Sequence, residues 1–410
     1  MLVNKNLNKL LSAVLVAGGV TAAIPSYAAN QAMTDLIKIL HDKGSLTTEE
    51  YQLLVKAANS DDQQAAQATR VVEEQVADVA KASKASSWTD SIRVKGDIRL
   101  RYQGQSEDGK ADRDRGRVRY RLGVAAKPND GLEVAAGLAS GGSDPRSTNQ
   151  SFDSSFSSKN IVLDYAYAKY KINENFTAIG GKFARKAYLW APTDLMWDGD
   201  INPEGVSVNY TRGSDLGTSF ANAGLWVLEE NSGSKEDPKL AYLQIGQKFG
   251  ADNLFGTVAG TYYDFSEINA LDDLTGFANT NTDFQFDAIS VSAEVGLKNT
   301  LGEGSKVSLI SDWVQNVDTD TSEDTGYSIG IKASQGPWSA KYIYADLEAN
   351  AVPDIFPDSD RFGGKTGIDG HEVAVNYQLL KNVTLGADYY NVDLDSANQD
   401  VLQLDLLIKY

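Results

Sequence analysis

The chain of 410 residues contains no cysteine and only two histidines, His41 and His371. Without cysteine there is no disulfide framework, no thiol nucleophile and no cysteine-ligated metal. Two histidines are too few for most histidine-based metal sites and offer little for a catalytic triad. The sequence shows no recognisable pair of His371 with a serine. We therefore expect a protein that is not an enzyme and that has no metal site and no cofactor.

Basic residues and long apolar runs are also scarce. The chain has 38 Lys+Arg against 56 Asp+Glu and a formal net charge of -18. A general nucleic-acid-binding protein needs a net basic face for phosphate contacts, so we expect no nucleic-acid partner. The longest apolar run, residues 10–24, is short for a membrane-spanning helix, which needs about 20 apolar residues. The length suits either two soluble domains or one large barrel.

Residues 1–28 have the organisation of a secretory signal peptide. Lys5 and Lys9 give a basic start, the apolar run follows, and Ser26-Tyr27-Ala28 has the small-x-small form of a cleavage site. We therefore expect an exported protein whose mature chain begins near Ala29.

Residues 29–59 are predicted to form a helical hairpin. Apolar residues follow helical spacing up to residue 40, Gly44-Ser45 breaks the pattern, and a second apolar run follows at 53–55. Thr47 and Glu50 have the spacing of a capping box, in which each side chain accepts a hydrogen bond from the other residue's backbone N–H. A second helix is therefore expected to begin at this point.

Residues 60–88 are rich in Ala, Gln and Val, with small or apolar residues at alternating steps of four and three. This spacing fits a thin coiled-coil stalk, and a single solvated helix or a linker is the alternative. We expect residues 29–88 to lie in the periplasm, where they would contact the cell wall or help the protein to trimerise.

The most distinctive stretch is RDRGRVRYR, residues 113–121. Arginine recurs at every second position, and from Val118 onward the intervening residues are apolar, which predicts a strand with one cationic and one apolar face. Residues 92–102 repeat the pattern. Two such neighbouring strands would share a densely cationic face, which is either the solvent side of a soluble sandwich or the water-filled lumen of a transmembrane barrel.

The remainder of the chain favours the barrel. Short turns alternate with long polar connections at residues 141–159, 185–203, 266–283 and 348–370, as in outer-membrane barrels. The last strand ends on Tyr410, which resembles the C-terminal assembly signal of such barrels. The predicted fold is therefore an all-β, antiparallel transmembrane barrel of about 16 strands over residues 89–410, of the kind found in outer membranes. The sixteen expected strands are 92–103, 115–127, 131–140, 160–171, 176–184, 204–212, 218–228, 239–249, 254–265, 284–298, 306–317, 326–335, 338–347, 371–380, 383–393 and 400–410.

Tyrosines near the strand ends would form the aromatic girdles at the two membrane interfaces. The residues assigned to the girdles are Tyr102, Tyr120, Tyr262, Tyr263, Tyr342, Tyr344, Tyr389 and Tyr390. Two acidic clusters, Asp318–Asp324 and Asp354–Asp360, are expected to be solvated loop tips. Divalent cations that bridge lipopolysaccharide phosphates are the alternative role for these clusters.

Four stretches of the sequence resemble the putative porins of Gram-negative outer membranes, whose members carry a short helical extension before the barrel. The stretches are VKGDIRLRYQG at 94–104, RGRVRYRLGVAAK at 115–127, SGGSDPRSTNQSF at 140–152 and MWDGDINPEGVSVNY at 196–210. The resemblance implies a sixteen-stranded, homotrimeric, water-filled channel that contacts outer-membrane lipid and lipopolysaccharide.

The same resemblance implies that the third long loop, residues 185–203, folds into the barrel and faces a basic ladder on its wall. The predicted pore-lining basic residues are Arg99, Arg101, Arg115, Arg117, Arg119, Arg121 and Lys182. The predicted acids of the constriction are Asp194, Asp198 and Asp200, with Glu204 at the exit of the loop. In the alternative interpretation, the arginines pair with acids on neighbouring strands such as Asp97 and Asp164 and only stiffen the wall.

The predicted function is passive diffusion of ions and small hydrophilic solutes. Charged side chains that line a pore set its ion preference. Unbalanced arginine would favour anions, because guanidinium binds carboxylate and phosphate in bidentate fashion, whereas the acidic loop acts in the opposite direction. The alternative function is a structural outer-membrane protein that tethers the membrane to the cell wall through residues 29–88.

Overall fold

The computed structural model describes residues 35–45, 47–56, 91–233, 236–271, 281, 285–319, 321–361, 363–394 and 397–410. Residues 1–87 and 88–410 form two separate units. The predicted signal peptide (1–28) and the predicted coiled coil (60–88) lie outside the described residues. Within the described residues, no helix has both the length and the apolar character needed to cross a membrane.

In the N-terminal unit, residues 35–42 and 48–56 are helical. The capping box at the start of the second helix is confirmed. The Thr47 N–H donates to Glu50 Oε2 at 2.9 Å, and the Glu50 N–H donates to Thr47 Oγ1 at 3.3 Å. The hydrogen bond from the Thr47 backbone lowers the pKa of the Glu50 carboxyl, because it stabilises the ionised form. The His41 and Tyr51 rings, one from each helix, lie 4.5 Å apart between centroids.

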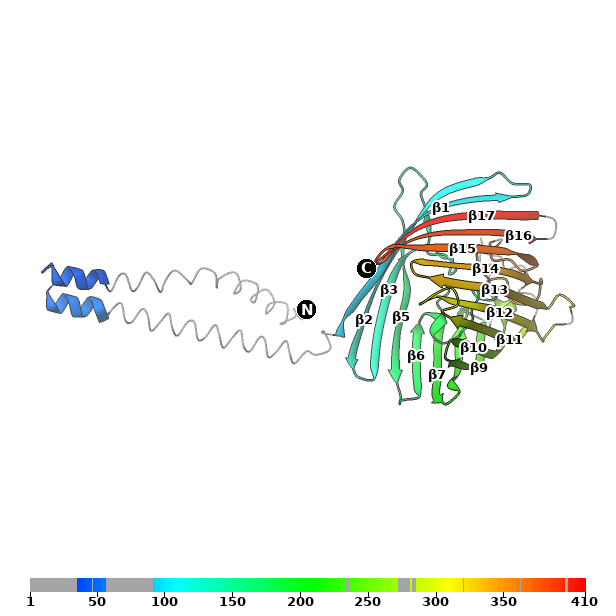
Figure 1. Cartoon of the computed structure of the whole chain (residues 1–410), viewed down its shortest axis with the longest axis horizontal. Helices are drawn as coiled ribbons and strands as arrows, with labels where there is room; N and C mark the ends of the chain where they lie inside the picture. The colour runs from blue at the N-terminus through cyan, green and yellow to red at the C-terminus, as the bar shows by residue number, and fades with distance from the viewer. Residues whose placement is uncertain are drawn as a thin grey trace. The chain divides into compact units, whose positions relative to one another are not determined.

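The second unit is a closed antiparallel barrel of sixteen long strands, which confirms the predicted fold class (Figure 1). The two-residue strand β4, which was not predicted, pairs with β2 near one end of the barrel. The strands are β1 (Arg93–Glu107), β2 (Arg113–Asn129), β3 (Leu132–Ser140), β4 (Gln150–Ser151), β5 (Ile161–Lys171), β6 (Phe176–Lys182), β7 (Glu204–Ser214), β8 (Gly217–Val227), β9 (Lys239–Ala251), β10 (Leu254–Ser266), β11 (Phe286–Lys298), β12 (Lys306–Asn316), β13 (Thr325–Gln335), β14 (Trp338–Leu347), β15 (Ile368–Leu380), β16 (Val383–Leu394) and β17 (Ala397–Lys409).

The barrel closes where β17 pairs with β1. At this seam the backbones of Gly96 and Tyr410 exchange two hydrogen bonds, of 2.9 and 3.0 Å. The Tyr410 ring lies over Gly96, where an added Cβ would come within 2.6 Å of the ring. Glycine at this position therefore lets the terminal aromatic residue pack against the seam, and the closure leaves no free strand edge.

Side chains alternate between a polar lumen and an apolar outer surface, as a barrel in a membrane requires. Polar residues are buried inside the barrel, among them Ser207, Asn222, Gln244, Thr261, Ser292, Asp312 and Gln403. Large apolar residues are exposed on the outside, among them Val206, Leu225, Ile245, Val291, Ile329 and Leu404. This alternation is the reason that the arginines of β1 and β2 face the interior.

The same alternation corrects part of the predicted aromatic girdle. Tyr262 and Tyr389 are 44% and 42% exposed, whereas their neighbours Tyr263 and Tyr390 are 3% and 6% exposed. Adjacent residues of a strand point to opposite faces. The assignment of Tyr263 and Tyr390 to the outer girdle is therefore wrong, because both side chains are buried on the inner side of the wall.

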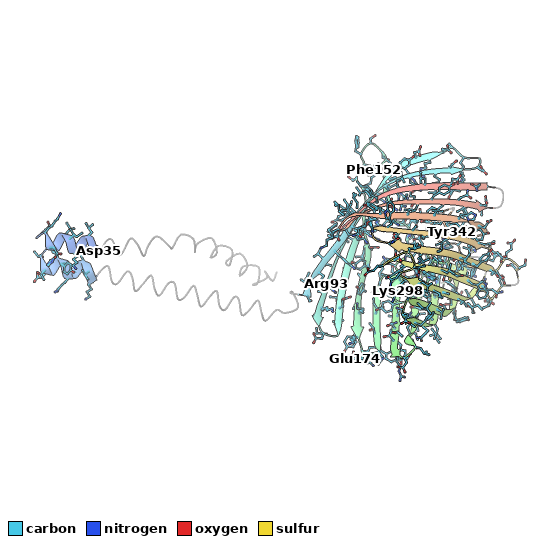
Figure 2. All side chains as sticks on the ribbon, viewed as in Figure 1. Asp35, Arg93, Phe152, Glu174, Lys298 and Tyr342 are labelled. Atoms are coloured by element: carbon cyan, nitrogen blue, oxygen red, sulfur yellow. The ribbon has the colours of Figure 1, made fainter. Side chains whose placement is uncertain are left out.

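Short turns lie at one end of the barrel and the longest connections at the other. Glu174, in the turn between β5 and β6, and Phe152, in the connection between β3 and β5, mark these opposite ends (Figure 2). Three long connections concern the lumen. We name them L2 (residues 141–160, between β3 and β5), L3 (183–203, between β6 and β7) and L7 (348–367, between β14 and β15). L3 contains the 3-10 helix η3 (Arg185–Ala187), and the 3-10 helix η4 (Ile268–Ala270) follows β10.

L3 and L7 fold into the barrel and share one apolar cluster with its inner wall. Trp197 of L3 is 2% exposed and packs against Phe356 of L7, with ring centroids 4.7 Å apart, and against Trp226 of β8 at 5.7 Å. Apolar side chains in a connection are stabilised when they leave water, which draws both connections inward. The lumen is therefore partly filled on this side, and the polar wall of β1 and β2 remains outside the cluster.

Candidate pore constriction

The arginines of β1 and β2 face one another in register. Arg99 lies opposite Arg119, and Arg101 lies opposite Arg117. Like charges directly across a strand pair repel, so this arrangement needs neighbouring acids, neutral hydrogen-bond partners or water to be stable. The structure contains two kinds of partner, and they divide the ladder into two groups.

Arg101, Arg119 and Arg121 are neutralised by acids of the barrel wall. Arg101 forms a bidentate pair with Asp405 of β17, with both N–O distances 2.7 Å. Asp97 of β1 accepts hydrogen bonds from Arg119 Nη2 and Arg121 Nε, each at 2.8 Å. Bidentate pairs of this kind hold the guanidinium plane in a fixed orientation. These contacts are of the type expected if the arginines stiffen the wall.

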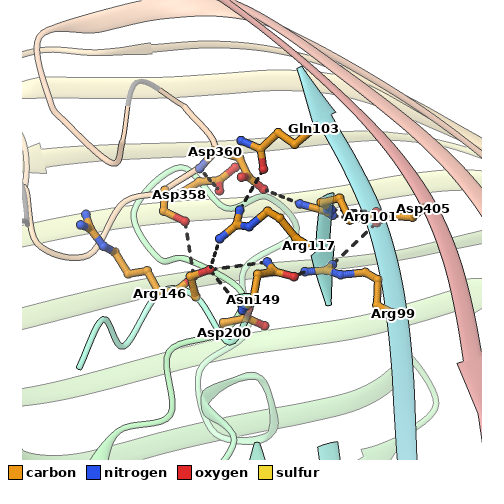
Figure 3. Close-up of polar contacts among 12 residues, drawn as sticks. Arg99, Arg101, Gln103, Arg117, Arg146, Asn149, Asp200, Asp358, Asp360 and Asp405 are labelled. Carbon is orange, nitrogen blue, oxygen red and sulfur yellow. Dashed lines mark hydrogen bonds and ion pairs between the residues drawn. The ribbon is translucent and has the colours of Figure 1, made fainter. Parts of the chain in front are cut away.

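Arg99, Arg115 and Arg117 bond chiefly to neutral groups, and Figure 3 shows the contacts of Arg99 and Arg117. Arg117 Nη1 donates to Gln103 at 2.8 Å, Arg99 Nη2 donates to Asn149 of L2 at 2.7 Å, and Arg115 reaches Gln105 at 3.5 Å. Arg99 lies 3.8 Å from Asp405, which is already paired with Arg101. The Nε atoms of all three have no hydrogen-bond partner among the described protein groups. Nearby acids therefore neutralise little of the positive charge of these three arginines, and their Nε–H groups can still donate hydrogen bonds.

The four predicted acids occupy four different environments. Asp200 of L3 lies 3.7 Å from Arg121 of β2. Glu204 is the first residue of β7 and pairs with Lys182 of β6 at 2.8 Å, so this acid and this base of the prediction bind each other. Asp194 lies 3.8 Å from Lys186 within L3 itself. Among the described residues, Asp200 is the one predicted acid in an ion pair with an arginine of the ladder.

Asp198, the fourth acid, joins L3 to L7. Its carboxylate accepts hydrogen bonds from the backbone N–H of Asp200 at 2.8 Å and of Ser359 at 2.9 Å, and its own N–H donates to the Phe356 carbonyl at 2.7 Å. Burial raises the pKa of Asp198 to about 7, although the two N–H donors oppose the shift. Burial likewise raises the pKa of Asp358 in L7, against the opposing charge of Arg361.

L3 crosses the lumen and is anchored on the opposite wall. Gln244 of β9 accepts from the Trp190 N–H and donates to the Trp190 carbonyl, both at 2.9 Å. Asp312 of β12 accepts from the Thr193 N–H at 2.9 Å and from the Thr193 hydroxyl. Lys332 of β13 donates to the Pro192 carbonyl at 2.9 Å. These buried polar contacts fix the height of L3 in the barrel.

L7 supplies an acid that the sequence did not single out for the pore. Asp360 lies 3.6 Å from Arg101, so L7 as well as L3 faces the arginine wall (Figure 3). Arg361 of L7 donates to Glu372 of β15 at 2.6 Å and anchors the connection. The interpretation of Asp354 and Asp358 as solvated loop tips is wrong. Their exposed fractions are 0% and 8%, because the apolar residues around them draw L7 into the barrel.

The wall and L3 enclose a cavity of about 400 Å³. Its lining includes Asp97 and Arg121 from the wall and Asp200 and Asn202 from L3. Asp164, which the sequence suggested as a wall partner for arginine, accepts a hydrogen bond from Asn202 at 2.8 Å instead. Charges of both signs therefore face each other across this gap.

Two partners of the ladder, Asp405 and Asp360, were missed in the sequence. Asp405 occupies a polar position of the last strand, and closure of a barrel places the last strand beside the first. Asp360 follows the apolar pair Ile355-Phe356, which is out of place in a solvated loop and is a signal of inward folding. Both signals were present, but neither gives the register that brings the acid to a particular arginine.

Fold and site together define a channel-forming β-barrel of the outer membrane. The chain belongs to the putative porin family, whose model matches residues 105–302 and 324–410, more than half of the chain. No curated protein sequence matches it. The family and the fold indicate a channel rather than an enzyme, and an outer-membrane location.

Solved structures are similar in fold. OprB of Pseudomonas putida, determined at high pH, is 13% identical, with 78% of this chain and 95% of that chain covered and a TM-score of 0.55. A mutant of the Rh. blastica porin is 11% identical over 78% of this chain and 100% of its own, with a TM-score of 0.48. A triple mutant of the Rhodopseudomonas blastica porin is 10% identical at the same coverage, with a TM-score of 0.47. The likeness to OprB supports the barrel fold alone.

Proposed function

We propose that the protein is a water-filled porin for passive diffusion of ions and small hydrophilic solutes, and that its narrowest part lies between the arginine ladder and the inward-folded L3 and L7. A closed barrel of sixteen strands is wide enough to contain an aqueous channel. The observation that carries the proposal is the approach of Asp200 and Asp360, from two different connections, to Arg121 and Arg101 on one wall.

Purified, refolded protein in a planar bilayer tests this proposal. We expect stable steps of ion conductance, because the wall of β1 and β2 is polar and is not covered by the apolar cluster. A correctly folded barrel that inserts but conducts no ions would contradict the proposal, and would leave the tethering function as the better account.

We further propose a weak preference for anions. Arg99, Arg115 and Arg117 bond mainly to amides and hydroxyls, whereas Asp200 and Asp360 each lie near an arginine that already has a wall acid. A positive surplus therefore lines the gap, and such a surplus favours anions in a pore. The sign of the reversal potential across a KCl gradient gives the preference directly.

For the assembled protein, we propose a homotrimer in the outer membrane, in contact with lipid and lipopolysaccharide, with the N-terminal unit in the periplasm near the cell wall. The resemblance to porins supports the trimer, and the predicted signal peptide supports the periplasmic location. Chemical cross-linking in intact outer membranes tests the oligomer. Cell-wall association of a chain that lacks residues 33–86 tests the role of the extension, and unchanged association would argue against a tether.

A further inference from the structure

A second charged cavity, of about 370 Å³, lies between L3 and the wall strands β11, β13 and β14. None of the ladder residues lines it. The cavity adjoins another of about 410 Å³, with which it shares Glu294, Lys332 and Lys341. Its charged lining consists of Lys186, Asp194, Glu294, Lys332 and Lys341.

The lysines of this cavity are arranged at some cost in stability. Lys332 and Lys341 lie directly opposite each other in the register of β13 and β14, where like charges repel. Lys341 forms an ion pair with Glu372, which compensates its charge. The Lys332 ammonium donates instead to the neutral Pro192 carbonyl. Because an ammonium group has three donors, Lys332 can still bind an acceptor from the cavity.

The carboxylates that line the cavity can also accept further hydrogen bonds. Glu294 accepts a hydrogen bond from Ser308 at 2.8 Å, and Asp194 lies 3.8 Å from Lys186. An ionised carboxylate can accept about four hydrogen bonds, so both acids have free acceptor positions. Glu294 and Lys332 are half-buried. They are therefore partly shielded from water while their polar groups line the open cavity.

The balance of charge selects the class of ligand. Charges of both signs line the cavity, namely the ammonium groups of Lys186, Lys332 and Lys341 and the carboxylates of Asp194 and Glu294, while Glu372 behind Lys341 also binds Arg361. A simple anion bound to Lys332 would be repelled by Asp194 and Glu294, and a simple cation bound to the acids would be repelled by the lysines. A solute that carries both charges meets a complementary group at each end.

We propose that this cavity is a binding subsite for small zwitterionic solutes, with one carboxylate and one ammonium group, on their way through the channel. The solute carboxylate binds the Lys332 ammonium, and the solute ammonium binds the Glu294 carboxylate, with Asp194 beside it. This proposal rests on the proposed channel function and names a class of solute for it.

Three probes of equal chain length test the subsite: 4-aminobutyrate as the zwitterion, butyrate as the anion and butylammonium as the cation. Each is added at increasing concentration to single channels in KCl, and the dissociation constant is taken from the saturable reduction of the ion current. We expect 4-aminobutyrate to bind about tenfold more tightly than either of the other probes, because a hydrogen bond to a charged group is gained at both ends.

Two variants separate the two ends of the site. Lys332→Met should raise the dissociation constant of 4-aminobutyrate about tenfold, and Glu294→Gln should do the same. Lys332→Met should not weaken butylammonium binding, and Glu294→Gln should not weaken butyrate binding. Lys298→Met and Glu303→Gln, exposed residues near the turn between β11 and β12, are matched controls and should leave all constants unchanged.

Calorimetric titration of the detergent-solubilised full chain with the same probes measures binding without any current. Binding that persists in a barrel without conductance would leave the subsite in place and contradict the channel alone. Conductance with equal constants for the three probes, or constants unchanged in both variants, would overturn the subsite. Circular dichroism of each variant shows whether the barrel has folded.

Discussion

The Asp198 carboxylate in L3 accepts a hydrogen bond of 2.9 Å from the backbone N–H of Ser359 in L7, across a separation of 161 residues in the chain. This contact, with the Asp198 N–H donated to the Phe356 carbonyl, joins the two connections that fold into the lumen. The constriction is thus a single structure built from two connections, and its integrity depends on a buried acid.

The first prediction is a pH dependence of this junction. The pKa of Asp198 is about 7, which is above the roughly 3.9 of an exposed aspartate. The joined state therefore binds the proton more tightly than the separated state does. Protonation of Asp198 stabilises the joined state fully below about pH 4, and this stabilisation is lost as the pH rises through about 7. The equilibrium constant between the joined and separated states falls by up to about tenfold per pH unit in this range.

Hydrogen exchange of the Ser359 segment, corrected for the intrinsic rate, measures this effect at pH 5 and pH 7. Wild-type protection should fall between the two values, and that of Asp198→Asn, in which this carboxylate cannot ionise, should fall less. Parallel curves for the two proteins would show that Asp198 does not titrate at the junction.

The second prediction concerns Trp197, the largest side chain of L3 in the apolar cluster. Trp197→Ala removes the contacts of this ring with Phe356 and Trp226. It should destabilise the inward-folded position of L3 by about 3–5 kcal/mol, as for other buried tryptophans. L3 should then leave its position in part of the molecules. We expect larger and noisier single-channel currents.

Trp338→Ala is the matched control, because Trp338 is 55% exposed on the outer surface. Its currents should equal those of the wild type. Equal currents for Trp197→Ala as well would mean that L3 does not limit the flow of ions.

The third prediction separates members of the ladder. Arg117 bonds to Gln103 and Ser147, so Arg117→Glu changes the charge of the gap without breaking an ion pair. The reversal potential in a KCl gradient should move toward that of a cation-selective pore. Arg113→Glu makes the same change on the same strand, but Arg113 is exposed and its effect should be smaller. Equal shifts would place Arg117 outside the constriction.

The fourth prediction is that selectivity weakens with salt. Ions screen charges over about 10 Å at 0.1 M and about 3 Å at 1 M. The ratio of anion to cation permeability should therefore approach that of free solution as KCl rises from 0.1 to 1 M. A ratio that does not change with salt would indicate that binding, rather than the field of the wall, sets the preference.

The fold was predictable because it depends on local alternation. The spacing of arginine and apolar residues in 113–121 specifies two faces of a strand, and repeated alternation specifies the barrel. The partners of individual arginines were not predictable, since Asp405 reaches Arg101 through closure of the barrel and Asp360 reaches it through the inward-folded connection between β14 and β15. Such contacts depend on register and loop packing, which a linear pattern does not encode.

Glu204 illustrates the same limit. It was assigned to the acidic side of the constriction, but a strand pairing places it against Lys182. The Glu204 carboxylate is neutralised by Lys182, in an ion pair between the last residue of β6 and the first residue of β7. The sequence shows which residues carry charge, and only the three-dimensional structure shows which of these charges neutralise one another.

The central claim is that the side chain of Arg117 faces an ion-conducting gap, and substituted-cysteine accessibility tests it most directly because the natural chain has no cysteine. Arg117→Cys and its neighbour Val118→Cys, which points to the opposite face, are treated with a charged, water-soluble thiol reagent during single-channel recording. We predict a stepwise fall in current for Arg117→Cys and an unchanged current for Val118→Cys. Modification of Arg117→Cys, verified by mass, with no change in current would contradict the claim.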